Sequence, residues 1–181
     1  MADLVTTCRI LLVPVFVISM VYYVPGGSPA HFFPAAVFLI ACASDALDGY
    51  LARLRNESTA LGQMLDPIAD KLLLSSGFLC LLLCPHGALK PPAWVVILVL
   101  SRDFLLVGGV AVLYLTGREV EIKPSRLGKW AAFSQMITIG LLMLQVDAAV
   151  IAWRVTVVLT LASGFFYLWR EIGRPKSYAF R

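Results

Sequence analysis

Four aspartates lie within one short window of a strongly apolar chain: Asp45, Asp48, Asp66 and Asp70. If each half of this window is helical, Asp45 and Asp48 share one helix face because they are three positions apart. Asp66 and Asp70, four positions apart, share another face. Small residues beside both pairs would let two helices approach closely: Gly49, Ala52 and Gly62. We therefore expect two helix ends that press four carboxylates together.

Four neighbouring carboxylates need a bound cation or protonation, because like charges in a poorly solvated site cannot stay unneutralised. Oxygen ligands favour hard divalent ions such as Mg²⁺, Mn²⁺ or Ca²⁺. The alternative interpretation is that the aspartates are helix caps or paired surface charges. Asp66 before Pro67 has the form of a helix N-cap followed by proline at the first helical position. Capping explains one aspartate and not four, so the residues favour a divalent metal site.

The pattern D-x2-D-G-x2-A-R-x8-G-x3-D-x3-D over residues 45–70 resembles the signature of the CDP-alcohol phosphotransferase family at every fixed position. The resemblance implies an enzyme in which an acceptor hydroxyl attacks the phosphorus of a CDP-alcohol and CMP leaves. It implies two divalent metal ions, Mg²⁺ or Mn²⁺, and the ligands that hold them: Asp45, Asp48, Asp66 and Asp70. It also implies that Asp70 is the general base.

The same resemblance implies which residues bind the CDP-alcohol: Gly49, Arg53 and Thr59. Gly49 leaves room for the nucleotide, and the planar guanidinium of Arg53 suits the oxygens of a diphosphate. Arg53 could instead be a cation that extends to a membrane interface. Residues 3–9 resemble the N-x-x-T-x-x-R opening common in the family, but Asp3 stands where asparagine is usual.

The whole chain is more apolar than a soluble domain. It has 181 residues, of which 60% are hydrophobic, against roughly half or less in soluble proteins. A membrane-spanning helix needs about 20 apolar residues, and six such segments are found: 4–24, 31–54, 62–84, 93–117, 130–146 and 149–169. Only short connectors remain. We expect one domain over residues 1–181, an all-α membrane protein with six transmembrane helices around a polar active-site cavity that faces the cytoplasm.

Basic residues predict the orientation of the chain. With six spans, both termini and the connectors at 54–61 and 117–129 share one side, which holds most of the lysines and arginines. The positive-inside rule places that side in the cytoplasm. We therefore expect an integral protein of the bacterial inner (cell) membrane whose active site and termini are cytoplasmic.

The sequence leaves the role of two groups of charged residues open. Lys123, Arg126 and Lys129 cluster before the fifth apolar segment, where they could hold an acceptor phosphate or anionic lipid headgroups. Arg102 and Asp103 lie inside the fourth segment, and they could form an acceptor site or a structural ion pair.

Residues 123–130 and Gln135 resemble the phosphatidylglycerophosphate synthase and eukaryotic-type cardiolipin synthase branches of the family. The resemblance predicts a role in phospholipid biosynthesis, with phosphatidyl transfer from CDP-diacylglycerol to sn-glycerol 3-phosphate. One alternative is cardiolipin synthesis with phosphatidylglycerol as acceptor, toward which the Arg102-Asp103 pair leans. An ion-coupled transporter is disfavoured because a cation path needs neither Gly49 nor Arg53. The expected partners are the two substrates and membrane lipids, with no nucleic acid; a homodimer stays open.

Overall fold

The computed structural model describes the backbone of residues 2–22, 32–55, 60–83, 89–115 and 126–172, and the side chains of residues 11–22, 32–44, 69–83, 89–109 and 127–167. Over these residues the chain is helical. The helices are α1 (Ala2–Val21), α2 (Phe33–Arg55), α3 (Ala60–Leu83), α4 (Ala93–Leu115), α5 (Arg126–Met143) and α6 (Ala148–Ile172). Each predicted apolar segment corresponds to one helix, so the all-α class is confirmed.

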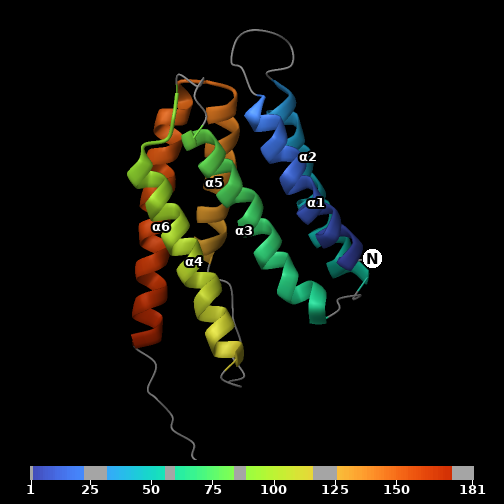
Figure 1. Ribbon diagram of the computed structural model, residues 1–181. Coiled ribbons are helices and arrows are strands. Elements are labelled where there is room, and N and C mark those ends of the chain that lie inside the picture. Colours follow the sequence, from blue (N-terminus) through green and yellow to red (C-terminus); the bar gives the residue numbers. More distant parts are fainter. Residues whose placement is uncertain (1, 23–31, 56–59, 84–88, 116–125, 173–181) are drawn as a thin grey trace, which may run out of the picture.

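The helices pack in two groups that share α3 (Figure 1). On one side, α1 packs against α2 and α3. Phe16 of α1 and Phe38 of α2 pair with ring centroids 5.6 Å apart, and Phe78 of α3 is fully buried. On the other side, α5 packs against α6, and α4 contacts both α3 and α6. The helix that carries half of the aspartate motif therefore also contacts the second group.

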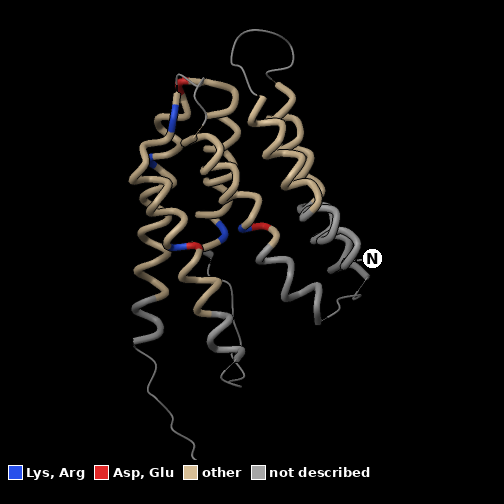
Figure 2. The backbone as a smooth tube through the Cα atoms, viewed as in Figure 1, with Lys and Arg blue, Asp and Glu red and all other residues tan. Residues whose placement is uncertain are grey.

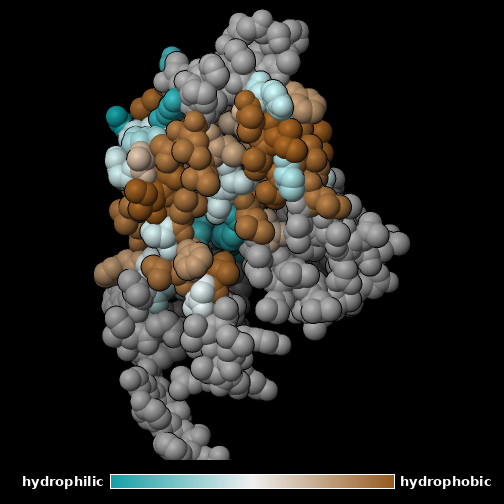
Figure 3. Space-filling model, viewed as in Figure 1, coloured by the Kyte–Doolittle hydropathy of each residue, from teal (hydrophilic) through white to brown (hydrophobic). Residues whose placement is uncertain are grey.

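The described helices place apolar side chains outside and several polar side chains inside. Large apolar side chains are exposed, among them Phe104 at 81% and Phe165 at 69%, and Figure 3 shows hydrophobic side chains over much of this face. The buried polar and charged side chains include Arg102, Asp103, Gln135, Thr138, Thr156, Thr160 and Ser163. An apolar exterior around a partly polar interior suits lipid better than water.

In the described part of the chain, α6 is the one helix whose length and composition suffice to cross a membrane, over Ala148–Tyr167. Leu11–Val21 in α1 and Phe33–Ser44 in α2 are shorter apolar stretches. The number of helices that cross the bilayer therefore stays a prediction, as does the polar cavity.

The turn between α5 and α6 is built on Gln145, a non-glycine residue with a φ of 54°. The Val146 N–H donates to the Leu141 carbonyl and the Gln145 N–H to the Leu142 carbonyl, both at 3.2 Å, which is the Schellman arrangement that ends many helices. The Gln145 side chain also pairs with the segment before α4. Its Oε1 accepts from the Leu89 N–H at 2.8 Å, and its Nε2 donates to the Leu89 carbonyl at 3.2 Å. One residue thus joins the end of α5 to the segment before α4.

Candidate functional site

The backbone places the two halves of the aspartate motif on consecutive helices. Asp45 and Asp48 lie in the second half of α2, and Asp66 and Asp70 lie in the first half of α3. Only residues 56–59 separate the two helices, so the halves lie toward the joined ends of α2 and α3. The helical backbone confirms that each pair shares one helix face. The side chains of Asp45, Asp48 and Asp66 lie outside the described ones.

The interpretation of Asp66 as a helix N-cap is wrong. The third helix begins at Ala60, so Asp66 and Pro67 lie inside it. Pro67 has no N–H to donate to the carbonyl four positions earlier, yet the helix continues through it. Asp66 is not the N-cap because the residues before it, from Ala60 on, are already helical. None of the four aspartates stands at a helix N-terminus, so capping does not account for the motif.

The residues predicted to bind the CDP-alcohol lie on or beside α2. Gly49 and Arg53 follow Asp45 at intervals of four positions in α2, so the backbone puts the three on one face. The side chain of Arg53 lies outside the described ones, and Thr59 lies in the 56–59 connector, outside the described residues. Their roles stay predictions.

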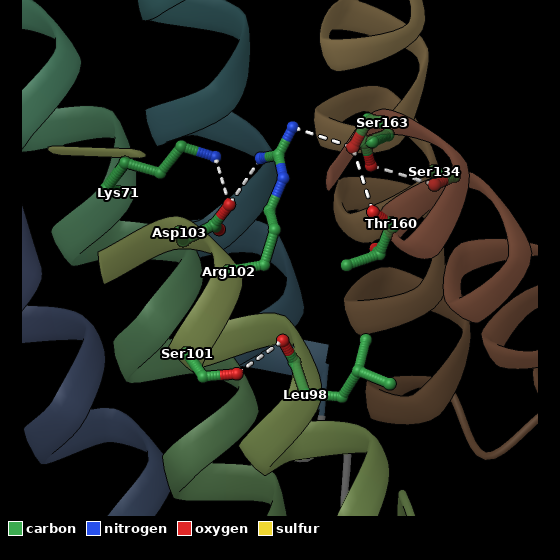
Figure 4. A network of polar contacts seen from close by, with 9 residues as sticks. Lys71, Leu98, Ser101, Arg102, Asp103, Ser134, Thr160 and Ser163 are labelled. Carbon is green, nitrogen blue, oxygen red and sulfur yellow. Dashed lines mark hydrogen bonds and ion pairs between the residues drawn. The ribbon is translucent and has the colours of Figure 1, made fainter. Parts of the chain in front are cut away.

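Asp70 is the motif aspartate whose side chain the structure describes, and it is half-buried. The next residue, Lys71, reaches across to α4, where its Nζ lies 3.0 Å from Asp103 Oδ1. The same oxygen accepts a hydrogen bond from Arg102 Nη1, and Arg102 Nη2 donates to Ser163 Oγ of α6 at 2.9 Å. Figure 4 shows this chain of contacts across three helices. It links the helix that carries Asp70 to α4 and α6.

Two cations share one carboxylate in this network. The side chains of Lys71, Arg102 and Asp103 are only 19%, 9% and 4% exposed. Their formal charges sum to one positive charge, and a nearby anion stabilises a poorly solvated cation. Figure 2 shows the charges on α3, α4 and α5 at about one height in the bundle. The three residues therefore form a partly buried ion network with one more cation than anion.

The structure describes part of the predicted acceptor-binding residues, namely the start of α5 and Arg102 of α4. The fifth helix begins at Arg126, earlier than residue 130 as predicted, so Arg126 and Lys129 are helical and share a face. The Lys129 side chain is exposed. The Arg126 side chain and the whole of Lys123 lie outside the described residues. Arg102 pairs with Asp103, which confirms the ion-pair interpretation. An additional role of Arg102 toward the acceptor stays a prediction.

A row of buried polar side chains between α5 and α6 was not predicted. The hydroxyls of Thr138 and Thr156 lie 2.9 Å apart, and Thr160 and Ser163 continue the row along α6. The spacing of Thr156, Thr160 and Ser163 by four and three positions was a signal, because it puts three hydroxyls on one face of an apolar helix.

The chemistry of the motif residues fits the predicted metal ions. Among the side chains that the structure describes, no three or more His, Cys, Asp or Glu residues come together, and Asp70 is the only motif carboxylate in that set. The four motif donors are all carboxylates, arranged as same-face pairs on two consecutive helices. Such a donor set suits a hard divalent cation.

Comparisons with known proteins cover nearly the whole chain. A family model described as CDP-alcohol phosphatidyltransferase matches residues 1–166. The Bacillus subtilis (strain 168) protein named CDP-diacylglycerol--glycerol-3-phosphate 3-phosphatidyltransferase is 35% identical over 180 residues, which cover 90% of each chain. A Mycobacterium tuberculosis (strain H37Rv) protein named "Probable phosphatidylglycerophosphate synthase" is 35% identical over 178 residues, 95% of this chain and 81% of its own. A Haemophilus influenzae (strain Rd) protein with the same name as the Bacillus one is 32% identical over 169 residues, 90% of this chain and 88% of its own.

Proposed function

The chain belongs to the CDP-alcohol phosphatidyltransferase family, and from this premise we propose that it transfers a phosphatidyl group from CDP-diacylglycerol to sn-glycerol 3-phosphate, giving phosphatidylglycerophosphate and CMP. The observation that carries the proposal is the complete aspartate motif on two consecutive helices. The relatives support the acceptor, because the Bacillus and Haemophilus proteins are named for transfer to glycerol 3-phosphate.

The motif residues divide the chemical work. Asp45, Asp48, Asp66 and Asp70 would hold two divalent ions, Mg²⁺ or Mn²⁺, which neutralise the diphosphate when bound. Asp70 accepts the proton of the acceptor hydroxyl. The hydroxyl oxygen then bonds to the lipid-side phosphorus of CDP-diacylglycerol. The bond from that phosphorus to the bridging oxygen breaks, and CMP leaves with the electron pair.

Gly49, Arg53 and Thr59 contribute to CDP-diacylglycerol binding. Gly49 leaves space for the nucleotide, and Arg53 donates to the diphosphate with a planar fork of N–H groups. Thr59 offers a hydroxyl near the CDP group. Support for this arrangement comes from the shared helix face of Asp45, Gly49 and Arg53.

The acceptor phosphate binds to a group of cations: Arg102, Lys123, Arg126 and Lys129. Glycerol 3-phosphate is a small, doubly charged anion, so it needs several converging cations to approach an acidic site. The surplus positive charge of Lys71 and Arg102 over Asp103 supports this placement, as does the shared face of Arg126 and Lys129.

We place the protein in the bacterial inner membrane with six spans, and with the motif and both termini in the cytoplasm. The exposed apolar surface around a polar interior supports membrane embedding, and α6 is long and apolar enough to cross a bilayer. The basic connectors support the orientation.

An acceptor panel tests the function. Purified protein in detergent is given CDP-diacylglycerol and either glycerol 3-phosphate or phosphatidylglycerol, and CMP and lipid products are measured. We expect CMP and phosphatidylglycerophosphate with glycerol 3-phosphate, and neither product from Asp70→Asn beyond a small residual rate. Product with phosphatidylglycerol alone would assign the enzyme to cardiolipin synthesis, and absence of CMP with every acceptor would contradict phosphatidyl transfer.

A further inference from the structure

Among the residues that the structure describes, three buried ones on three neighbouring helices carry polar atoms without a hydrogen-bond partner. Gln135 of α5 is fully buried, and neither its amide oxygen nor its amide nitrogen is paired. The Thr160 hydroxyl of α6 and the Arg102 Nε of α4 are likewise buried and unpaired. Buried polar atoms in proteins are nearly always paired because an unpaired one loses its hydration without compensation. These atoms therefore need a partner that the described part of the chain does not supply.

The register of α5 and α6 brings Gln135 and Thr160 to the same level. The Oγ1 atoms of Thr138 and Thr156 are 2.9 Å apart, so these residues face each other across the two antiparallel helices. One turn toward the start of α5 leads from Thr138 to Gln135, and one turn toward the end of α6 leads from Thr156 to Thr160. Gln135 and Thr160 thus share the inner faces of the pair, one turn from the threonine bridge.

Arg102 connects the region around Gln135 and Thr160 to the ion pairs of Asp103. Its Nη2 donates to Ser163 Oγ at 2.9 Å, and Ser163 Oγ donates to the Thr160 carbonyl at 3.0 Å. Ser163 follows Thr160 by about one turn, or ~5 Å along the helix axis. Figure 4 shows Arg102, Ser163 and Thr160 together, with Ser134, the sequence neighbour of Gln135, beside them. In Figure 3, hydrophilic side chains lie between hydrophobic ones on this face, while Gln135 and Thr160 themselves are buried.

We propose that Gln135 and Thr160 form a subsite that binds a neutral hydroxyl group of the polyol acceptor, one helical turn from the cation Arg102; the proposal rests on the function given above. A carboxamide offers donors and an acceptor together, which matches a hydroxyl that both donates and accepts. Glycerol 3-phosphate has one hydroxyl that reacts and one at C2 that does not. In glycerol 3-phosphate the C2 hydroxyl lies within the length of one helical turn from the phosphate. It is therefore the group that Gln135 and Thr160 bind.

The test compares two acceptors that differ by this one hydroxyl, glycerol 3-phosphate and 3-hydroxypropyl phosphate. Wild-type protein is assayed first, and failure with both acceptors would contradict phosphatidyl transfer to glycerol 3-phosphate rather than the subsite alone. We expect the wild type to prefer glycerol 3-phosphate in kcat/KM by roughly tenfold or more. Gln135→Leu and Thr160→Val should lose most of that preference, with the KM for CDP-diacylglycerol unchanged. Thr138→Val, buried one turn away on the same face, should keep it.

Equal activity of the wild type on both acceptors would overturn the proposal. So would variants that lose activity on both acceptors equally and keep the wild-type preference, because this result assigns Gln135 and Thr160 to packing or to an ordered water only. Thr160→Val preserves the side-chain shape, so it carries the same comparison if Gln135→Leu does not fold. Thermal unfolding of each variant in detergent separates loss of folding from loss of discrimination.

Discussion

Asp70 and Lys71 are adjacent in α3, but their side chains point in different directions and have different roles. Successive residues of a helix point about 100° apart, since one turn takes 3.6 residues. Asp70 belongs to the aspartate motif, whereas the Lys71 ammonium lies 3.0 Å from Asp103 of α4. A single turn of α3 therefore carries both the proposed general base and a contact that ties the helix to its neighbour.

Asp70→Asn should lower kcat by about 10²–10⁴-fold while leaving CDP-diacylglycerol binding largely intact. The amide keeps the shape and one oxygen of the carboxylate, but it cannot accept the proton of the acceptor hydroxyl. Turnover and equilibrium binding of CDP-diacylglycerol check the two halves of this expectation. Asp45→Asn is the matched comparison, because Asp45 is proposed as a metal ligand and not as the base, so its loss should weaken metal binding without removing the proton acceptor. Turnover of Asp70→Asn near the wild-type rate would remove Asp70 as the base.

Arg126→Ala should raise the KM for glycerol 3-phosphate by roughly tenfold or more, the size of one charge-assisted contact, with little change in the KM for CDP-diacylglycerol. Arg126 opens α5 and shares a face with Lys129. Steady-state kinetics with both substrates varied check it, and Lys90→Ala, a basic residue ahead of α4 and outside the predicted acceptor cluster, is the control. An unchanged acceptor KM would remove Arg126 from the site.

At the scale of elements, α3, α4 and α6 are joined by buried polar contacts rather than by apolar packing alone. Lys71, Asp103, Arg102 and Ser163 form the chain of contacts across these helices. Breaking a buried ion pair leaves the partner charges uncompensated, which costs more than the pair contributes when intact. The position of the helix that carries Asp70 should therefore depend on Asp103.

Asp103→Asn should destabilise the protein by about 3–5 kcal/mol, because two largely buried cations lose their shared anion. Thermal unfolding in detergent measures the effect. Ser101→Ala is the control on the same helix, since Ser101 is exposed and its hydroxyl donates only to the Leu98 carbonyl of its own helix. Adding Lys71→Met to Asp103→Asn should recover part of the loss, and an unchanged unfolding temperature in Asp103→Asn would contradict the expectation.

Gln145→Ala should destabilise the α5–α6 turn by about 1–3 kcal/mol, because Leu89 loses both side-chain partners. Gln145→Gly loses the same hydrogen bonds but adopts a φ of 54° without a Cβ clash, so it should be more stable than the alanine variant by roughly 1 kcal/mol. Unfolding temperatures of the two variants check the order. If alanine proves the more stable of the two, the positive φ at residue 145 does not govern this turn.

At the scale of the whole molecule, an apolar exterior surrounds charged and hydroxyl-bearing side chains. Lipid has no hydrogen bonds to offer, so polar groups gather inside where they can pair with one another or with substrate. The charges on α3, α4 and α5 lie at about one height in the bundle (Figure 2).

Excess EDTA should abolish CMP release, and Mg²⁺ or Mn²⁺ should restore it. The carboxylates of the motif and the diphosphate of the substrate repel one another unless divalent ions neutralise them. The control is EDTA already saturated with Mg²⁺, which should leave activity unchanged. Full turnover in excess free EDTA would contradict the metal requirement.

The helices and the placement of the motif aspartates on them could be predicted from the sequence alone. Apolar segments long enough to span a bilayer predicted each helix to within a few residues, because burying or lipid-embedding a continuous apolar run requires its backbone to bond internally. Spacings of three and four positions placed Asp45 with Asp48, and Asp66 with Asp70, on common helix faces. The motif also led to the family, which the match over residues 1–166 establishes.

The contacts between distant helices required the packed structure. Whether Arg102 pairs with Asp103 alone or also with Ser163 depends on which face of α6 meets α4, and no local pattern specifies that choice. The Lys71–Asp103 ion pair and the unpaired amide of Gln135 depend in the same way on the rotation and register of neighbouring helices. Helix periodicity says which residues share a face, but only packing between helices decides what that face meets.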